Sequence, residues 1–263
     1  MKVEDALGRQ FDFDTAPRRI VSLVPSITET LFAFGLDDEV VGATDYCVHP
    51  GDRLAQVPRV GGTKNVRVDE VVALEPELVI ANREENRRRN VEALEARGLR
   101  VFVTYVRTLA EAVRDLGTLG RIMRCHAKAA AIARELDAAL AEVAGAPAPR
   151  VLALIWKKPW MTFNADTFAH DLISASGGRN PFADATARYP RISEAELAAA
   201  DPEVILLPTE PYAFGEEDRR ELGSLDCQAA RNGRVHVVEG ELLSWYGPRM
   251  PRALRTFSRL FRG

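Results

Sequence analysis

The sequence predicts an α/β fold built as two lobes with a long helix joining them. Short β-branched runs alternate with longer amphipathic stretches along most of the chain, a pattern typical of strands and helices around a mostly parallel sheet. The two halves share three matching segments in the same order. Between the halves, a stretch rich in Ala, Leu, Glu and Arg has almost no strand signal.

Seven short apolar runs predict the strands, and four amphipathic stretches between them predict helices that pack on the sheets. We expect strands at residues 20–24, 40–43, 78–81, 101–105, 151–156, 204–207 and 235–238. We expect helices at residues 26–34, 69–74, 86–96 and 194–199. The opening segment, in which Gly8 separates two short alternating pieces, predicts a small hairpin laid against the first lobe.

The middle of the chain predicts a helix at about residues 127–143, roughly 25 Å long at 1.5 Å per residue. It ends at Gly145, and Pro147 follows as a stop signal. This helix is a candidate rigid connector. The expected domains are an N-terminal α/β lobe with its hairpin at residues 1–107, a connecting helical segment at 108–146 and a C-terminal α/β lobe at 147–263.

The matching segments favour a quasi-duplicated molecule with a cleft between its lobes. Each match alone is weak, but all three keep their order and similar offsets. They pair residues 19–23 with 150–154, 75–80 with 201–206, and 98–103 with 233–238.

Composition excludes several classes of function. The 263 residues include 35 Lys and Arg against 38 Asp and Glu, a formal charge of −3, which argues against a nucleic-acid partner. No window is apolar enough to span a membrane. The three cysteines, Cys47, Cys125 and Cys227, are distant and odd in number, which argues against a disulfide framework.

Enzyme motifs are also missing from the sequence. It contains no GxGxxG, GxxxxGK[ST], HExxH or GxSxG, so the usual phosphate, zinc and serine-hydrolase devices are absent. A His–carboxylate site assembled only by the fold stays open. The N-terminus has acidic residues and no apolar core of a secretory signal, so either the protein stays in the cytoplasm or an export segment is absent from this sequence.

Aromatic residues follow several of the predicted strands, where ligands bind to parallel sheets. Such side chains suit a large, flat, partly apolar ligand; the alternative is that some of them cover the lobe cores. We favour ligand contact for Trp245 and Tyr246. The full aromatic set is Tyr46, Trp156, Trp160, Tyr189, Trp245 and Tyr246.

Charged residues lie at the same strand ends. Arg249 and Arg252 flank Pro251 at the start of the last helix, where guanidinium groups can bind phosphate or carboxylate in a bidentate manner. The alternative is that both arginines lie on the solvated surface and bind no ligand. Further candidates for ligand contact follow the strand at 78–81. The alternative is that the acidic residues among them stabilise the N-terminus of the next helix. These further candidates are Arg83, Glu84 and Glu85.

Cys47 and His49 share one loop and are possible metal ligands. Two donors are too few for a structural zinc site, so we favour a loop without a metal role. We expect no intrinsic metal or cofactor.

Four motifs together resemble the cobalamin and ferric-siderophore substrate-binding proteins of ABC importers, over residues 1 to about 260. The resemblance implies two Rossmann-like lobes joined by one long helix, with the ligand cleft between them. The motifs lie at residues 19–29, 60–62, 73–80 and 177–180.

The resemblance also implies how the chain meets an importer. Members of the family carry an acidic residue on each lobe that pairs with arginines of the permease. Asp69 and Glu70 stand at the first such place, and Glu194 and Glu196 near the second, shifted from the expected Ser-x-Glu. The alternative is that Asp69 and Ser193 serve as N-caps of the two helices.

The resemblance implies a non-enzymatic protein that binds a corrinoid (cobalamin-like) ligand and passes it to an ABC permease and ATPase. Where the vitamin B12 receptors commonly present Trp in the first lobe, this chain has Lys64, Asn65 and Asn82. A ferric siderophore or haem is therefore the alternative ligand. A tetrapyrrole metal chelatase-like enzyme is a further alternative. We expect a monomer in the periplasm or at the cell surface, with the cytoplasm as the alternative.

Overall fold

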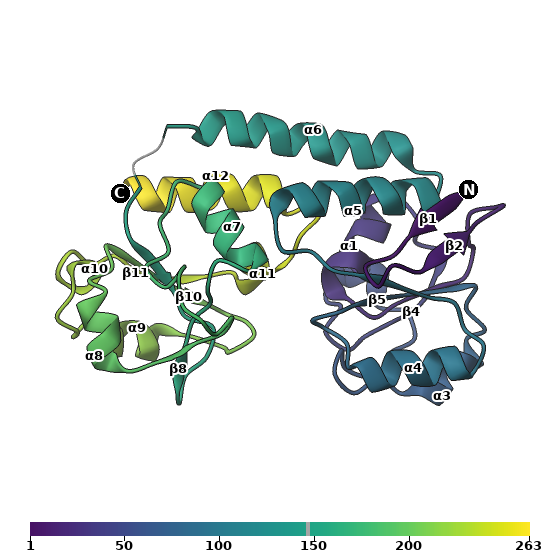
Figure 1. Cartoon of the computed structure of the whole chain (residues 1–263), viewed down its shortest axis with the longest axis horizontal. Helices are drawn as coiled ribbons and strands as arrows, with labels where there is room; N and C mark the ends of the chain where they lie inside the picture. The colour runs from purple at the N-terminus through teal and green to yellow at the C-terminus, as the bar shows by residue number, and fades with distance from the viewer. Residues whose placement is uncertain (146–147) are drawn as a thin grey trace. The chain divides into compact units, whose positions relative to one another are not determined.

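The computed structural model describes residues 1–145 and 148–263 (Figure 1). These residues form two compact units, each of which brings together separate stretches of the chain. Unit 1 comprises Met1–Val106, Ala110–Ala133 and Tyr246–Pro248. Unit 2 comprises Arg107–Leu109, Arg134–Trp245 and Arg249–Gly263. The expected boundary at 146/147 and the stop signal at Pro147 lie outside the described residues.

Unit 1 contains a parallel sheet of four strands. Its order is β4 (Val40–Ala43), β3 (Ile20–Ser22), β5 (Leu78–Asn82) and β6 (Val101–Thr104). The helices between strands are α1 (Pro25–Ala33), α2 (Gly51–Leu54), α3 (Val68–Ala73) and α4 (Arg88–Ala96). Figure 1 shows α3 and α4 packed side by side against this sheet. Every residue of β5 is buried, as a central parallel strand requires.

The N-terminal hairpin closes the β6 edge of this sheet. Strands β1 (Lys2–Glu4) and β2 (Gln10–Asp12) pair antiparallel. The turn between them has Gly8 at φ 76°, a left-handed conformation that glycine adopts without strain. The amide of Ala6 donates to the carbonyl of Val103 at 2.9 Å. The hairpin thus satisfies backbone groups that an edge strand would leave unpaired.

Two helices follow the first sheet. They are α5 (Leu109–Ile122) and α6 (His126–Val143). A Cβ on Gly120 would lie 2.6 Å from the Cβ of Ala129, so glycine lets the two helices approach closely. The helix expected at 127–143 is therefore present as α6, and its role as the single connector stays a prediction.

Unit 2 contains a parallel sheet of three strands and a small antiparallel pair. The sheet order is β11 (Val235–Val238), β10 (Val204–Pro208) and β7 (Val151–Ala153), and the pair is β8 (Trp160–Met161) with β9 (Arg191–Ile192). The helices are α7 (Phe168–Ala175), α8 (Glu194–Ala199), α9 (Glu216–Leu222), α10 (Gln228–Arg231), α11 (Gly240–Ser244) and α12 (Met250–Arg262). Figure 1 shows α12 packed with α7 and α11.

The repeated segments occupy equivalent places in the two sheets. The amides of Glu77 and Glu203 donate to the carbonyls of Arg19 and Arg150, each at 2.8 Å. Strand β3 pairs in parallel with β5, and β7 pairs in parallel with β10, the strand that follows the Pro-Glu segment in each half. That segment begins in both halves with a left-handed residue, Glu75 at φ 46° and Asp201 at φ 42°. The sequence echo therefore reflects a repeated backbone geometry.

Three predicted strands, at 20–24, 101–105 and 151–156, are shorter than expected, and the last loses the most residues. The run at 151–156 leaves the sheet after Ala153, because the next residues turn into a hairpin in which Trp156 bridges Met161. The α/β class with parallel sheets is confirmed. Across the two described ranges, no helix is long and apolar enough to cross a membrane.

Candidate functional site

In unit 1, the loop after β5 is held rigidly and presents Arg83. The Asn82 side-chain oxygen accepts from the amides of Glu84 at 2.7 Å and Glu85 at 3.2 Å. The Asn86 side chain in turn accepts from the Asn82 amide at 2.8 Å. Both glutamates are half-buried and Arg83 is exposed, so this loop turns a cation rather than its carboxylates toward solvent.

Three other predicted residues of unit 1 lie beside this loop or after β4. Lys64 donates to the carbonyl of Glu84, and Asn65 is exposed next to it. The Arg83 guanidinium lies 5.0 Å above the Tyr105 ring, within cation–π range. Tyr46 follows β4 and is 63% exposed.

Tyr246 belongs to unit 1 and is buried. Its hydroxyl accepts from the Asn82 side-chain amide at 3.0 Å and lies 3.4 Å from the Thr104 hydroxyl. Burial raises the pKa of this hydroxyl, and the nearby Asp115 carboxyl adds to the rise. These contacts favour the core role for Tyr246, and ligand contact by Tyr246 stays a prediction.

In unit 2 the predicted aromatic residues divide by exposure. Trp156 is 44% exposed and Tyr189 is 41% exposed, whereas Trp160 and Trp245 are buried. The Trp160 ring stacks on Phe214 with centroids 6.2 Å apart. Trp156 and Tyr189 therefore remain the aromatic side chains of this unit that can meet a ligand with least rearrangement.

The two C-terminal arginines have partners within unit 2. The Arg249 guanidinium lies 5.2 Å above the ring of Trp245. Arg252 is exposed and forms an ion pair with Glu239 at 2.6 Å. An anionic ligand would have to compete with Glu239 for Arg252, and anion binding by either arginine stays a prediction.

Cys47 is fully buried. Its sulfur lies 3.0 Å from the Thr28 hydroxyl and 3.2 Å from that of Thr44. Burial raises the pKa of this thiol, which disfavours the thiolate that metals bind. Within residues 1–145 and 148–263, no group of three or more His, Cys, Asp or Glu side chains is arranged to hold a metal ion.

The acidic residues expected to meet a permease are all exposed. Asp69 pairs with Arg97 at 2.6 Å and Glu70 with Arg67 at 2.7 Å. Glu196 accepts from the amide and hydroxyl of Ser193, forming a capping box at the start of α8. Glu194 lies in the same first turn, and its side chain makes no hydrogen bond or ion pair among the described residues.

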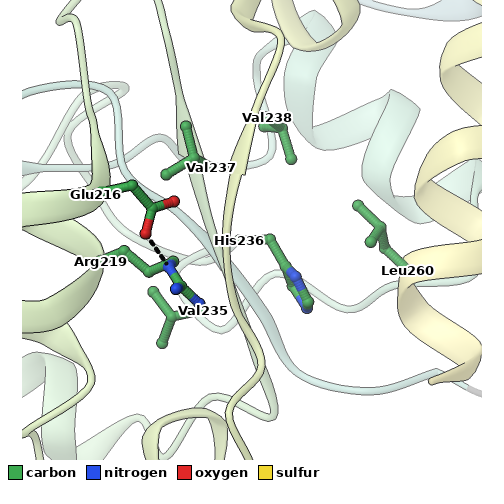
Figure 2. Close-up of a pocket in the computed structure, with 7 residues that line it drawn as sticks. All are labelled: Glu216, Arg219, Val235, His236, Val237, Val238 and Leu260. Carbon is green, nitrogen blue, oxygen red and sulfur yellow. Dashed lines mark hydrogen bonds and ion pairs between the residues drawn. The ribbon is translucent and has the colours of Figure 1, made fainter.

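Two cavities lie among the described residues, one in each unit. One, of about 250 Å³, runs along the free edge of β11 between α9 and α12, and Figure 2 shows the Glu216–Arg219 pair on its wall. The other, of about 260 Å³, lies in unit 1 beside Asp115 of α5 and Tyr105. Neither is lined by a residue that the sequence singles out as a ligand contact.

Sequence reasoning missed two aromatic residues at strand ends. Tyr105 follows β6 and lies beneath Arg83, and Tyr212 follows β10 and contacts Trp156 with centroids 5.6 Å apart. Their position after a strand is the signal that could have identified them, as it did for Tyr46.

The chain is similar to known binding proteins in its sequence. A periplasmic binding protein family model matches residues 20–238. The vitamin B12-binding protein of Photorhabdus laumondii is 29% identical over 197 residues, which cover 73% of this chain and 71% of that protein.

Two solved structures resemble the fold closely. The periplasmic vitamin B12-binding protein BtuF of Vibrio cholerae superposes with a TM-score of 0.82 at 25% identity, covering 94% of this chain and 97% of that one. A periplasmic haem-binding protein from Pseudomonas aeruginosa gives a TM-score of 0.82 at 28% identity, covering 94% and 93%.

Proposed function

The chain belongs to the periplasmic binding protein family, and from this membership we propose that it binds a corrinoid and delivers it unchanged to an ABC importer. The observation that carries the corrinoid proposal is the similarity, in sequence and in fold, to proteins named for vitamin B12 binding. Delivery implies work in the periplasm or at the cell surface, with an ABC permease and ATPase as partners.

The exposed aromatic side chains suit this ligand. Tyr46 in unit 1 and Trp156 and Tyr189 in unit 2 all lie in loops and are at least 41% exposed. Aromatic rings cover the faces of a large conjugated macrocycle well, since they bury much apolar area at little entropic cost. Lys64, Asn65 and Arg83 supply polar groups for the amide and phosphate periphery of such a ligand.

Haem is the second candidate, favoured by the similarity to the haem-binding protein. The Arg83 guanidinium, exposed above Tyr105, provides a cation for a carboxylate of the ligand. Both candidates are coloured, so the visible spectrum of the complex distinguishes them.

The test is a titration of the purified chain with cobalamin and, separately, with haem. We expect saturable quenching of tryptophan fluorescence and a raised melting temperature with cobalamin. Trp156→Phe should remove much of the quenching. Trp160→Phe, which changes a buried ring 5.3 Å from the Lys157 ammonium, should retain it. Saturation with haem alone would support the second candidate. No melting shift and no spectral change with either ligand would overturn both, and turnover of a porphyrin with a divalent metal would indicate an enzyme.

For docking to the permease, we propose Asp69 and Glu70 on α3 and Glu194 and Glu196 on α8. Glu194 is the most available of the four, because the others already make an ion pair or a capping bond. Replacing Glu194 with Lys should leave ligand affinity unchanged and weaken transport in cells. Wild-type transport by this variant would exclude Glu194 from docking.

A further inference from the structure

Trp156 lies on a tight hairpin whose base is fixed by the backbone. The amide of Ile155 donates to the carbonyl of Met161 at 2.9 Å, and the amide of Met161 donates to that of Trp156 at 3.1 Å. The second arm of this hairpin is β8, which pairs with β9 and places Trp160 opposite Ile192. The backbone that carries the exposed indole is therefore held from both ends.

A row of aromatic rings links that exposed indole to the core of unit 2. Tyr212 meets Trp156 edge to face, with centroids 5.6 Å apart and planes at 71°. Tyr212 also contacts Phe214 at 4.6 Å, and Phe214 stacks on the buried Trp160 at 6.2 Å. Edge-to-face aromatic pairs at such distances contribute stabilising free energy in addition to that of the apolar area they bury. Tyr212 therefore restrains the Trp156 indole from the side.

The next residue along the hairpin is anchored by charge. The ammonium of Lys157 binds Asp218 at 2.5 Å and Glu221 at 2.7 Å, both on α9. It also lies 5.3 Å above the Trp160 ring. The Lys157 and Asp218 side chains are each only 11% exposed, and a charge pair this well covered is costly to break.

An exposed side chain loses conformational freedom when a ligand stacks on it, and that loss weakens binding. The contact with Tyr212, and the ion pairs of Lys157 with Asp218 and Glu221, already restrict the indole in the free protein. Less conformational entropy is then lost when the ligand binds. The exposed part of the indole is then a preformed surface.

We propose that Tyr212 and Lys157 are positioning residues, which hold the Trp156 indole ready to stack on a flat conjugated ligand. This proposal rests on the proposed binding function. Tyr212 acts through Trp156 and need not touch the ligand itself.

The first test needs no ligand. Protein labelled with 5-fluorotryptophan gives one fluorine signal for each of its three tryptophans, and Trp156→Phe assigns the signal of residue 156. Tyr212→Leu should sharpen that signal, because the indole gains motion, while the linewidths of the Trp160 and Trp245 signals stay the same. Tyr212→Phe, which keeps the ring, is the matched control and should leave all three unchanged. An unchanged Trp156 linewidth in a folded Tyr212→Leu variant would overturn the proposal.

The second test is a double-mutant cycle with cobalamin and haem as probes. Tyr212→Leu should weaken binding about three- to tenfold in the wild-type background and have no effect in the Trp156→Ala background. An equal loss in both backgrounds would show that Tyr212 contacts the ligand directly. If the wild type binds neither probe, the proposed function fails, while the fluorine signals still decide whether Tyr212 restrains Trp156.

Discussion

Asp115 on α5 is a carboxyl group whose chemistry is governed by burial. Its Oδ2 is buried and has no hydrogen-bond partner among the described residues. Burial raises its pKa to about 7. Glu111, Arg114 and Tyr105 line the same cavity, and the hydroxyl of Tyr246 lies near enough to feel the Asp115 charge.

This residue should make stability depend on pH. The unfolded chain releases the Asp115 proton near the ordinary pKa of 3.8, whereas the folded chain holds it up to about 7. Folding stability therefore falls as the pH rises from about 4 to about 7, and the penalty is complete above that range. Asp115→Asn removes the penalty, so its stability gain at about pH 8 should exceed its gain at about pH 5, on the order of 2 kcal/mol.

Urea unfolding at the two pH values measures this difference. Asp137→Asn, at an exposed position of α6, is the control and should give the same result at both. A pH-independent effect of Asp115→Asn would show that Asp115 is ionised in the folded protein.

Residue types and strand ends could be found in the sequence, but burial of single side chains could not. Trp156 and Trp160 are four positions apart, yet one is exposed and the other is covered by Phe214. Tyr246 has its partners 164 and 142 positions away. A local sequence pattern cannot show contacts between residues so far apart in the chain. The contacts of Tyr246 with Asn82 and Thr104 could therefore not be predicted, and ligand contact by Tyr246 was expected from its position alone.

At the scale of elements, the contact between α5 and α6 depends on one glycine. A Cβ at Gly120 would lie 2.6 Å from that of Ala129, whereas one at Gly117, in the same helix, would meet nothing within 4 Å. Gly120→Ala should lower the free energy of unfolding by about 1–3 kcal/mol, since the helices must move apart. Gly117→Ala should raise it by about 0.5–1 kcal/mol through helix propensity.

Thermal and urea unfolding of the two variants measures this pair of effects. The opposite signs separate packing from propensity, because both changes add the same methyl group to the same helix. If both variants were stabilised, the close approach of α5 and α6 would be wrong.

Strands of four residues rich in valine were predictable from the sequence, and strands of two residues were not. The runs at 40–43 and 235–238 are strands with those bounds, because each has enough β-branched residues to signal a buried strand. Strands β8 and β9 have two residues each and pair across about thirty positions. A two-residue strand has no measurable period, so its sequence cannot reveal it.

At the scale of the whole molecule, each unit contains stretches from distant parts of the chain. Tyr246→Phe should therefore weaken unit 1 around Asn82. Loss of the hydroxyl removes a partner from the buried Asn82 amide, at about 1–2 kcal/mol. Hydrogen exchange at residues 81–86 should become about tenfold faster. Tyr46→Phe, at an exposed ring, is the control and should leave that exchange unchanged. Unaltered protection at 81–86 in Tyr246→Phe would contradict this role of the hydroxyl.

The place of Tyr246–Pro248 in unit 1 has a consequence for biosynthesis. A ribosome makes the chain from its N-terminus, so almost all of unit 1 emerges first, yet its last three residues emerge after nearly all of unit 2. Domains generally fold as they are completed. Here the Asn82–Tyr246 hydrogen bond of unit 1 can form only after residue 246 has been translated, and until then nascent unit 1 is a candidate client for chaperones.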